Sequence, residues 1–232
     1  MKPSPNLLAG VLLLLGSLDL QAAPPAFQAT YDINKAGLTL GSMTATLSYN
    51  ANQYTYLKQS RANGLAALLS NDNLTERSSG TRHGEQLQSL QYLHQHKSRS
   101  KNRRDQFSFN TPNQVSGQYR NEAYQLQVPA GTVDPALMEL RIMDDLKANR
   151  PLRYAVTEKG ELKNYVFQRQ GREVLQLPAG RYECEKIHLV RDDGKRKTTI
   201  WLAPALNYVV ARIRHDEKGD VVESSLSGYV PR

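Results

Sequence analysis

Short segments in which apolar and polar residues alternate recur from Phe27 to Tyr229, with turn residues between them. Successive side chains of a strand point to opposite faces of a sheet, so this period of two is typical of half-buried strands. Glycine-bearing turns such as Glu158-Lys159-Gly160 have the length of hairpin connections, which predicts antiparallel pairing. The chain is therefore predicted to be mainly antiparallel sheet, with strands at Phe27–Asn34, Thr39–Tyr49, Tyr54–Ala62, Ser89–Lys101, Gln106–Phe109, Leu152–Thr157, Leu162–Arg169, Arg181–Val190, Lys197–Trp201, Tyr208–His215 and Val221–Gly228.

One segment departs from this alternation and has the signals of a helix. Asp134 can cap its start and Pro135 can occupy its first position, while Asn149 and Pro151 close the other end. These residues predict a helix from about Pro135 to Ala148 that serves as a lid or plug over the sheet.

The predicted helix has one apolar stripe. Met138, Ile142 and Leu146 recur at helical spacing, so they are predicted to face the sheet, whereas Arg141 and the pair Asp144 and Asp145 are predicted to face water. Methionines suit an adaptable binding surface, which makes Met138 and Ile142 candidate ligand contacts. A plain packing role is the alternative, since most helical apolar stripes are core.

The N-terminal residues have the pattern of a secretory signal peptide. Lys2 precedes an apolar run from Leu7 to Leu18, and the small residues Ala22 and Ala23 follow it. The run is shorter than the roughly 20 residues that cross a bilayer, so no transmembrane span is predicted after cleavage. Residues 1–23 are thus predicted to be a cleaved signal peptide, and residues 24–232 a single β-rich domain that works outside the cytoplasm.

The chain is basic. It has 30 Lys and Arg residues against 22 Asp and Glu residues, a net charge of +8. In the cell envelope such a protein attracts anionic lipid headgroups, acidic polysaccharide or acidic protein surfaces, so no nucleic-acid partner is predicted. Solubility alone is the other explanation of this charge.

Basic residues occupy every second position near the end of one predicted strand. Lys97, Arg99, Lys101 and Arg103 are predicted to project from the same face. Against an anionic bilayer each contributes on the order of 1 kcal/mol, which gives weak, salt-sensitive docking. The alternative is a solvated face that protects a sheet edge.

A second candidate contact is apolar. Leu65 and Leu68 lie in a loop between two predicted strands, where they are predicted to contact an apolar ligand. The alternative is that these leucines pack under the sheet as a short helical turn.

Local signatures of catalysis and cofactor binding are absent from the sequence, which has no G-x-S-x-G, H-E-x-x-H, C-x-x-C or glycine-rich phosphate loop. His94 and His96 share a strand face, but no third ligand stands at a supporting spacing, so neither a metal site nor a cofactor is predicted. Cys184 has no partner for a disulfide and is predicted to be a buried thiol. A triad assembled from distant residues leaves no local trace, so a hydrolase of envelope polymers or esters remains an alternative.

Several segments together resemble a known family. They are Tyr31 to Gly37 with Gly41, the Asp134-Pro135 helix with Leu140-Arg141, Pro178-Ala179-Gly180, Trp201-Leu202-Ala203, and Tyr208 to Ile213. The chain resembles the bacterial exported domain-of-unknown-function family numbered 3108 over nearly its whole length. This resemblance implies a periplasmic, β-rich protein with no assigned reaction and no catalytic residues to transfer.

The same resemblance implies a fold. It suggests a single strongly curved antiparallel sheet or half-barrel with one covering helix, similar to lipoprotein-carrier proteins, whose concave face holds acyl chains. Trp201 is best explained as a core anchor whose indole nitrogen finds a partner.

The leading functional hypothesis is a non-enzymatic periplasmic protein that binds an apolar or acyl-bearing ligand in a cavity between sheet and helix, with the basic residues meeting an anionic envelope component. A second hypothesis is an accessory factor for outer-membrane protein assembly, which binds its partner by a sheet edge or a basic face.

Overall fold

The computed structural model describes residues 23–69, 72–100, 102–190 and 196–232, without the side chains of Leu65, Leu68 and Leu69. Apart from Ala23, the predicted signal peptide lies outside the described residues. The strands are β1 (Phe27–Lys35), β2 (Leu38–Asn50), β3 (Gln53–Ala62), β4 (Asn73–His83), β5 (Gln86–Lys97), β6 (Asn102–Thr111), β7 (Gln114–Tyr119), β8 (Glu122–Gln127), β9 (Arg153–Glu158), β10 (Glu161–Leu177), β11 (Gly180–Leu189), β12 (Arg196–Ala203), β13 (Val209–Glu217) and β14 (Asp220–Pro231). The helices are α1 (Gly64–Leu69), α2 (Pro135–Lys147) and the 3-10 turn η1 (Pro204–Leu206).

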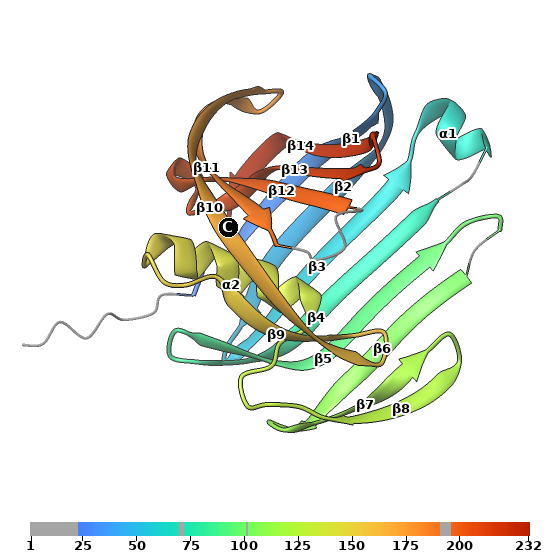
Figure 1. Ribbon diagram of the computed structural model, residues 1–232, viewed down its shortest axis with the longest axis vertical. Helices are drawn as coiled ribbons and strands as arrows, with labels where there is room; N and C mark the ends of the chain where they lie inside the picture. The colour runs from blue at the N-terminus through green and yellow to red at the C-terminus, as the bar shows by residue number, and fades with distance from the viewer. Residues whose placement is uncertain (1–22, 70–71, 101, 191–195) are drawn as a thin grey trace, which may run out of the picture.

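The strands form one antiparallel sheet in which chain neighbours are also sheet neighbours. This holds from β1 to β8 and from β9 to β14, and β1 pairs with β14, so blue and red strands lie side by side in Figure 1. The order begins with β8 and ends with β9, and among the described residues these two edges do not pair. The sheet is therefore strongly curved but not closed into a barrel, which confirms the mainly β, half-barrel prediction.

A turn, rather than strand pairing, brings the two ends of the sheet together. The backbone nitrogen of Lys159, in the β9–β10 turn, donates to Asp105 Oδ2 of β6 at 2.6 Å, and the Tyr124 hydroxyl of β8 donates to Asp105 Oδ1 at 3.1 Å. Gly160 follows with a φ of +76°, and a Cβ there would lie 3.3 Å from the Tyr124 ring. Burial raises the pKa of the Asp105 carboxyl. The curved sheet thus nearly closes at the polar contact around Asp105.

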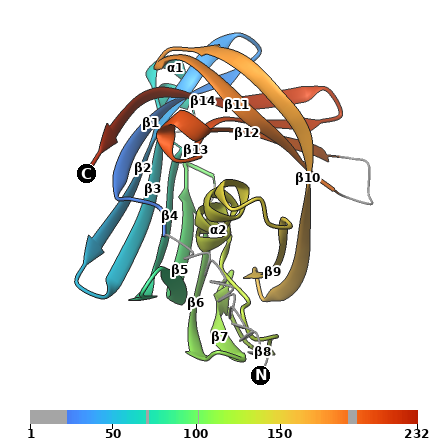
Figure 2. The same cartoon turned by 90° about the vertical axis from the view of Figure 1, so that its left-hand side faces the viewer.

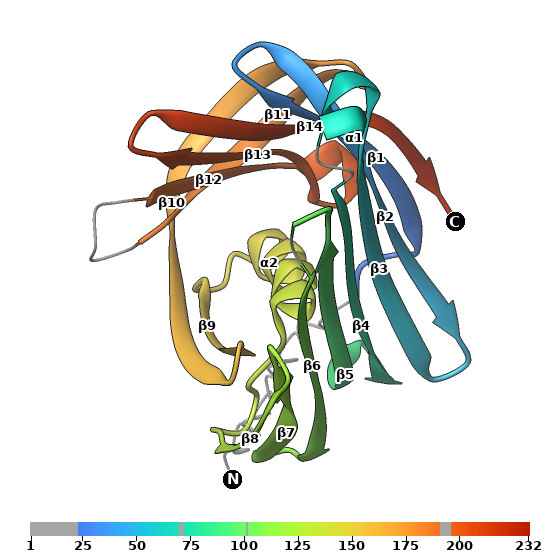
Figure 3. The same ribbon diagram turned by 90° about the vertical axis from the view of Figure 1, so that its right-hand side faces the viewer.

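The segment between the two sheet edges contains α2, which lies inside the curve of the sheet (Figures 2 and 3). Its predicted bounds and cap are confirmed, because Pro135 is the first helical residue and Asp134 Oδ1 accepts a hydrogen bond from Leu137 N at 2.8 Å. In the described part of the chain, no helix combines the length and apolarity needed to cross a membrane.

The prediction that one side of α2 faces water is wrong. Asp144 is 7% exposed and Asp145 is 9% exposed, because the helix lies within the curved sheet and not on its surface. Hydrogen bonds compensate for the burial of Asp145, since its carboxylate accepts one from Arg150 Nε at 2.7 Å and one from the Tyr154 hydroxyl at 2.8 Å. Burial raises the pKa of Asp144 to about 7.

Two strands, β4 and β7, were not predicted, and of β8 the sequence indicates only the end, at Leu126-Gln127 before the turn residues Pro129-Ala130-Gly131. The buried face of β4 contains Ser78 and the partly buried Glu76 where apolar residues were expected, so the strand lacks the usual alternation. These polar residues are present because α2 and its cap present polar groups to β4, as described below. Tertiary contacts, and not local propensity, define this strand.

The predicted continuous basic strand is also wrong. β5 ends at Lys97 and β6 begins at Asn102, so the chain reverses between them and Arg99 lies in the connection. His96 pairs with Arg103 across the hairpin, which places Lys97 and Arg103 on opposite faces of the sheet. The small polar residues around Arg99 favour this turn. Lys101 lies outside the described residues.

Two predictions about buried residues are confirmed. Cys184 is fully buried, and burial raises the pKa of its thiol to about 11, which disfavours the reactive thiolate form. Trp201 is 6% exposed, and its indole Nε1 donates to Glu173 Oε2 at 3.0 Å.

Candidate functional site

A largely buried ionic network joins α2 to the concave face of the sheet. Lys58 of β3 places its Nζ 2.7 Å from Glu76 Oε2 of β4 and 2.8 Å from Glu139 Oε2 of α2. Two tyrosines complete the network, since the Tyr56 hydroxyl donates to Glu139 and the Tyr92 hydroxyl donates to Glu76 Oε1 at 2.7 Å. One ammonium therefore lies between two carboxylates that belong to different elements.

Mutual attraction keeps this network charged despite its burial. Burial alone would lower the pKa of Lys58, but Glu139 and Glu76 outweigh it and hold that pKa above its usual value. Burial would raise the pKa of Glu76, yet Lys58 and the Tyr92 hydroxyl bring it below its usual value. The sequence contains one signal of this arrangement, because Lys58 follows Tyr54 and Tyr56 on the same face of β3.

The start of α2 is held by a second buried carboxylate. Asp134 caps the helix with one oxygen and accepts hydrogen bonds from the Ser78 and Ser89 hydroxyls with the other, the former at 2.6 Å. The Tyr54 hydroxyl lies 2.8 Å from Ser78 Oγ. Burial outweighs these hydrogen bonds and raises the pKa of Asp134 to about 6.

Beside the ionic network lies an apolar cavity of about 200 Å³, here called the helix cavity. Met138 and Ile142 of α2, two of the candidate ligand contacts, form one wall. The opposite wall comes from the second half of the sheet, with Tyr165, Phe167, Leu189, Ile200, Val210 and Ile213. Lys58 and the two carboxylates of its network also line this cavity, so it is apolar with one charged boundary.

A larger and more polar cavity of about 660 Å³, here called the polar cavity, adjoins it. Its cationic lining consists of Arg103, Arg104, Arg120, Lys159 and Arg196; its carboxylates are Glu76, Asp105 and Glu158; and its imidazoles are His94, His96 and His215. These residues come from β4 to β7 on one side and from β9, β12 and β13 on the other. The polar cavity therefore lies between the two halves of the curved sheet.

Shared lining residues make these cavities neighbours on the concave face, and the three together are here called the trough. Glu76, Pro135 and His215 line both the helix cavity and the polar cavity. Leu74 and His96 line both the polar cavity and an apolar cavity of about 300 Å³ beside α1, here called the distal cavity. The concave face thus offers apolar space at both ends and charged groups between them.

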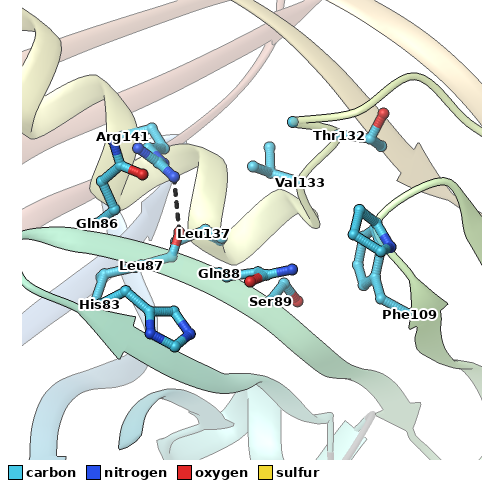
Figure 4. Close-up of a pocket in the computed structure, with 12 residues that line it drawn as sticks. His83, Gln86, Leu87, Gln88, Ser89, Phe109, Thr132, Val133, Leu137 and Arg141 are labelled. Atoms are coloured by element: carbon cyan, nitrogen blue, oxygen red, sulfur yellow. Dashed lines mark hydrogen bonds between the residues drawn. The ribbon is translucent and has the colours of Figure 1, made fainter. Parts of the chain in front are cut away.

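Figure 4 shows a separate cavity of about 190 Å³ between α2, β5 and the segment before the helix. The Arg141 guanidinium donates to the Leu87 carbonyl at 2.7 Å at one end, and Phe109 and Thr132 lie at the other. Its lining mixes polar and apolar groups, and it shares no residue with the trough.

The sequence-predicted ligand contacts fall into three groups. Met138 and Ile142 line the helix cavity and Arg103 lines the polar cavity, so the trough brings them together. Lys97 and Arg99 are exposed and do not line it. The side chains of Leu65 and Leu68 lie outside the described residues, although their backbone forms α1 beside the distal cavity.

Two histidines of the polar cavity have polar contacts. His96 Nε2 lies 2.7 Å from Asp72 Oδ1, and His215 Nδ1 lies 3.0 Å from Thr198 Oγ1. These two contacts are in different places, and neither joins a histidine to both a hydroxyl and a carboxylate in the interactions described. Within the described ranges, no group of three or more His, Cys, Asp or Glu side chains is placed to hold a metal ion.

Sequence reasoning missed most of the polar cavity. Arg120, Lys159 and Arg196 lie in or beside turns that are distant in the chain, and no local pattern connects them. Only the curvature of the sheet brings these residues to the same cavity, so a single sequence contains no signal that could have grouped them.

Comparison with protein families identifies the chain. Residues 27–225 match the family described as protein of unknown function (DUF3108), so the chain belongs to that family, as its sequence suggested. No curated protein matches the chain.

Comparison with solved structures supports the fold through one likeness. A β-barrel-like protein of the domain of unknown function DUF1849 from Brucella abortus superposes with a TM-score of 0.60 at 11% identity, over 91% of this chain and 99% of that one. A protein provisionally described as a lipoprotein, from Parabacteroides distasonis, reaches a TM-score of 0.33 at 8% identity, over 90% and 97% of the two chains. A protein provisionally described as exported, with a YmcC-like fold, from Bacteroides fragilis, reaches 0.31 at 10% identity, over the same shares. Only the first likeness is strong enough to support the fold.

Proposed function

We propose that this member of the DUF3108 family is a non-enzymatic protein of the cell envelope that holds an acyl-bearing amphiphile in its concave trough. The observation that carries the proposal is that the helix cavity adjoins the polar cavity, since Glu76, Pro135 and His215 line both. Apolar space beside a charged cavity suits a ligand with an apolar tail and a polar head.

The packing of the helix cavity also supports this function. Met138 is only partly buried and lines the cavity from α2, although eight other residues of the helix are buried. Methionine adapts its shape to different apolar surfaces, which suits an acyl chain of variable length. The walls come from α2 and from strands of the second half of the sheet, so both sides of the cavity are part of the folded scaffold.

An extracytoplasmic location is part of the proposal. It is supported by the signal-peptide pattern of residues 1–23, which ends immediately before the first described strand. In the periplasm of a Gram-negative cell, acyl-bearing molecules pass between two membranes through water, and a protein with a sheltered apolar cavity lowers the free-energy cost of that exposure.

Native mass spectrometry of the full chain, expressed with its own N-terminal segment and purified from a Gram-negative periplasm, tests the proposal. We expect co-purifying lipid, and a fluorescent fatty acid should bind the delipidated protein. Met138→Trp fills the helix cavity and should weaken binding about tenfold, because an overfilled apolar site costs more than 1 kcal/mol.

The matched control is Leu38→Trp, which adds the same indole at a side chain that is 67% exposed and lines none of the three cavities of the trough. It should bind the probe like the unmodified protein. A lipid-free mass together with no binding of the fluorescent fatty acid refutes the proposal, and so does equal binding by the two tryptophan variants when circular dichroism shows that both are folded.

A further inference from the structure

The carboxylates that line the polar cavity are already partnered. Glu76 pairs with Lys58 at 2.7 Å, and Glu158 pairs with Lys163 at 2.9 Å. Asp105 accepts its hydrogen bonds from uncharged donors of β8 and the β9–β10 turn. Neither Lys58 nor Lys163 lines the polar cavity, so the negative charge of this cavity is largely balanced from outside it.

Three cations of the same cavity differ from these carboxylates in their exposure and in their partners. In the described part of the structure, Arg103, Arg120 and Lys159 are exposed and have no carboxylate within 4.0 Å. Arg120 lies over the Tyr119 ring with its guanidinium 5.2 Å from the centroid, a contact that leaves its N–H groups available. Arg196, by contrast, pairs with Glu217.

These cations come from three separate places in the chain. Arg103 belongs to β6, Arg120 to the β7–β8 turn and Lys159 to the β9–β10 turn, which contacts Asp105. The polar contact that nearly closes the sheet therefore also places Lys159 beside the other two. Like charges gathered in one cavity repel one another, and an anion that binds among them relieves that repulsion.

We propose that the polar cavity binds an anionic headgroup, a phosphate or a carboxylate, of the molecule whose acyl chain occupies the helix cavity. This inference rests on the proposed function and specifies its ligand class as an anionic amphiphile. Arginine guanidinium groups form paired hydrogen bonds with phosphate and carboxylate oxygens, and lysine adds a point charge. The headgroup lies among Arg103, Arg120 and Lys159, and the acyl chain extends from the polar cavity into the adjoining helix cavity, so head and tail are bound at once.

The test compares ligands that differ only in the headgroup. Tridecanoate and dodecyl phosphate have an anionic head on a dodecyl chain, whereas dodecanol has the same chain without charge. We expect both anions to bind the delipidated full chain about tenfold more tightly than dodecanol, in line with hydrogen bonds between charged partners, and the difference should shrink in high salt.

Two variants distinguish the effect of a cation in the polar cavity from the effect of the protein's overall positive charge. Arg103→Gln removes a cation of the polar cavity and should lower the affinity for dodecyl phosphate severalfold without changing that for dodecanol. Arg214→Gln is the matched control, because Arg214 is also exposed but points to the convex face, between cavity-lining Ile213 and His215. The control should leave both affinities unchanged.

The outcomes distinguish this inference from the proposed function. Equal affinity for the anions and for dodecanol overturns the headgroup inference and leaves the acyl-binding function standing, whereas failure of all three ligands to bind overturns both. Equal effects of the two arginine variants also overturn the inference. Inorganic phosphate is added as a competitor, and displacement of dodecyl phosphate by millimolar phosphate supports a cavity that also accepts the free anion.

Discussion

Charged groups are partnered differently in two parts of the concave trough, the part beneath α2 and the polar cavity. Beneath α2, Lys58 lies within 3 Å of both Glu76 and Glu139, and Asp134 is bound by two hydroxyls and a backbone amide. In the polar cavity, exposed cations such as Arg103 have no carboxylate within 4.0 Å among the described residues.

The difference follows from solvation. A charged group that is removed from water lowers the stability of the fold by several kcal/mol unless close partners compensate for its lost hydration. The paired groups under α2 are therefore needed for stability. A cation at an open rim keeps its water and costs little, so it is available for a ligand. Substitutions should therefore affect unfolding in the first half and binding in the second.

The largest expected effect is that of Lys58→Met. This change leaves Glu76 and Glu139 buried without their shared cation, and we expect it to lower the free energy of unfolding by about 3–5 kcal/mol at pH 7. Urea denaturation followed by circular dichroism measures this effect. Arg103→Met, in the open half, should change stability by less than about 0.5 kcal/mol.

Lys35→Met provides a matched control, since it breaks a lysine–carboxylate pair of similar length, 2.9 Å, between exposed side chains. Its cost should stay below about 1 kcal/mol. If Lys58→Met is no more destabilising than this control, the contrast between the two halves is wrong.

Asp134→Ala should have the next largest effect. It removes the cap of α2 and the acceptor for Ser78 and Ser89, and we expect a loss of roughly 2–3 kcal/mol in the same denaturation experiment. Asp134→Asn keeps a carbonyl oxygen for the cap and should recover at least half of that loss. Equal costs for the two variants would show that the cap contributes nothing.

The smallest expected effect concerns the pH dependence of stability. Burial raises the pKa of Asp144 to about 7 in the folded protein from 3.8, so above pH 4 the folded state holds a proton that the unfolded state has lost. Its contribution therefore favours folding at low pH and is lost as the pH rises through 7. Relative to Asp144→Asn, the unmodified protein should lose roughly 2 kcal/mol between pH 5 and pH 7.

Parallel denaturation curves of the two proteins at both pH values measure this difference, since the other carboxylates are common to both. A difference that stays constant from pH 5 to pH 7 would mean that Asp144 titrates normally. It would also mean that the surroundings of Asp144 on α2 contain more water than its 7% exposure indicates.

Local sequence was sufficient to predict the elements that are marked by a repeating apolar–polar pattern or by capping and turn residues. The alternation predicted eleven of the strands, although the predicted strand through Lys101 ran past the end of β5, and Asp134 with Pro135 predicted the start of α2. The alternation failed to predict β4, because its buried Ser78 and partly buried Glu76 are polar and have their partners on the cap of α2 and on β3. A strand whose inward groups are polar cannot be recognised until its partners are known.

By itself, the sequence determined the antiparallel sheet, the single long helix and its cap, because hydrophobic periodicity and turn chemistry act over a few residues. Only the tertiary structure decided that α2 lies inside the sheet, that Asp144 is buried, and that Arg103, Arg120 and Lys159 share one cavity. The physical reason is that desolvation and charge balance depend on all neighbours in space. Those neighbours come from both ends of a sheet that curves until its edges nearly meet.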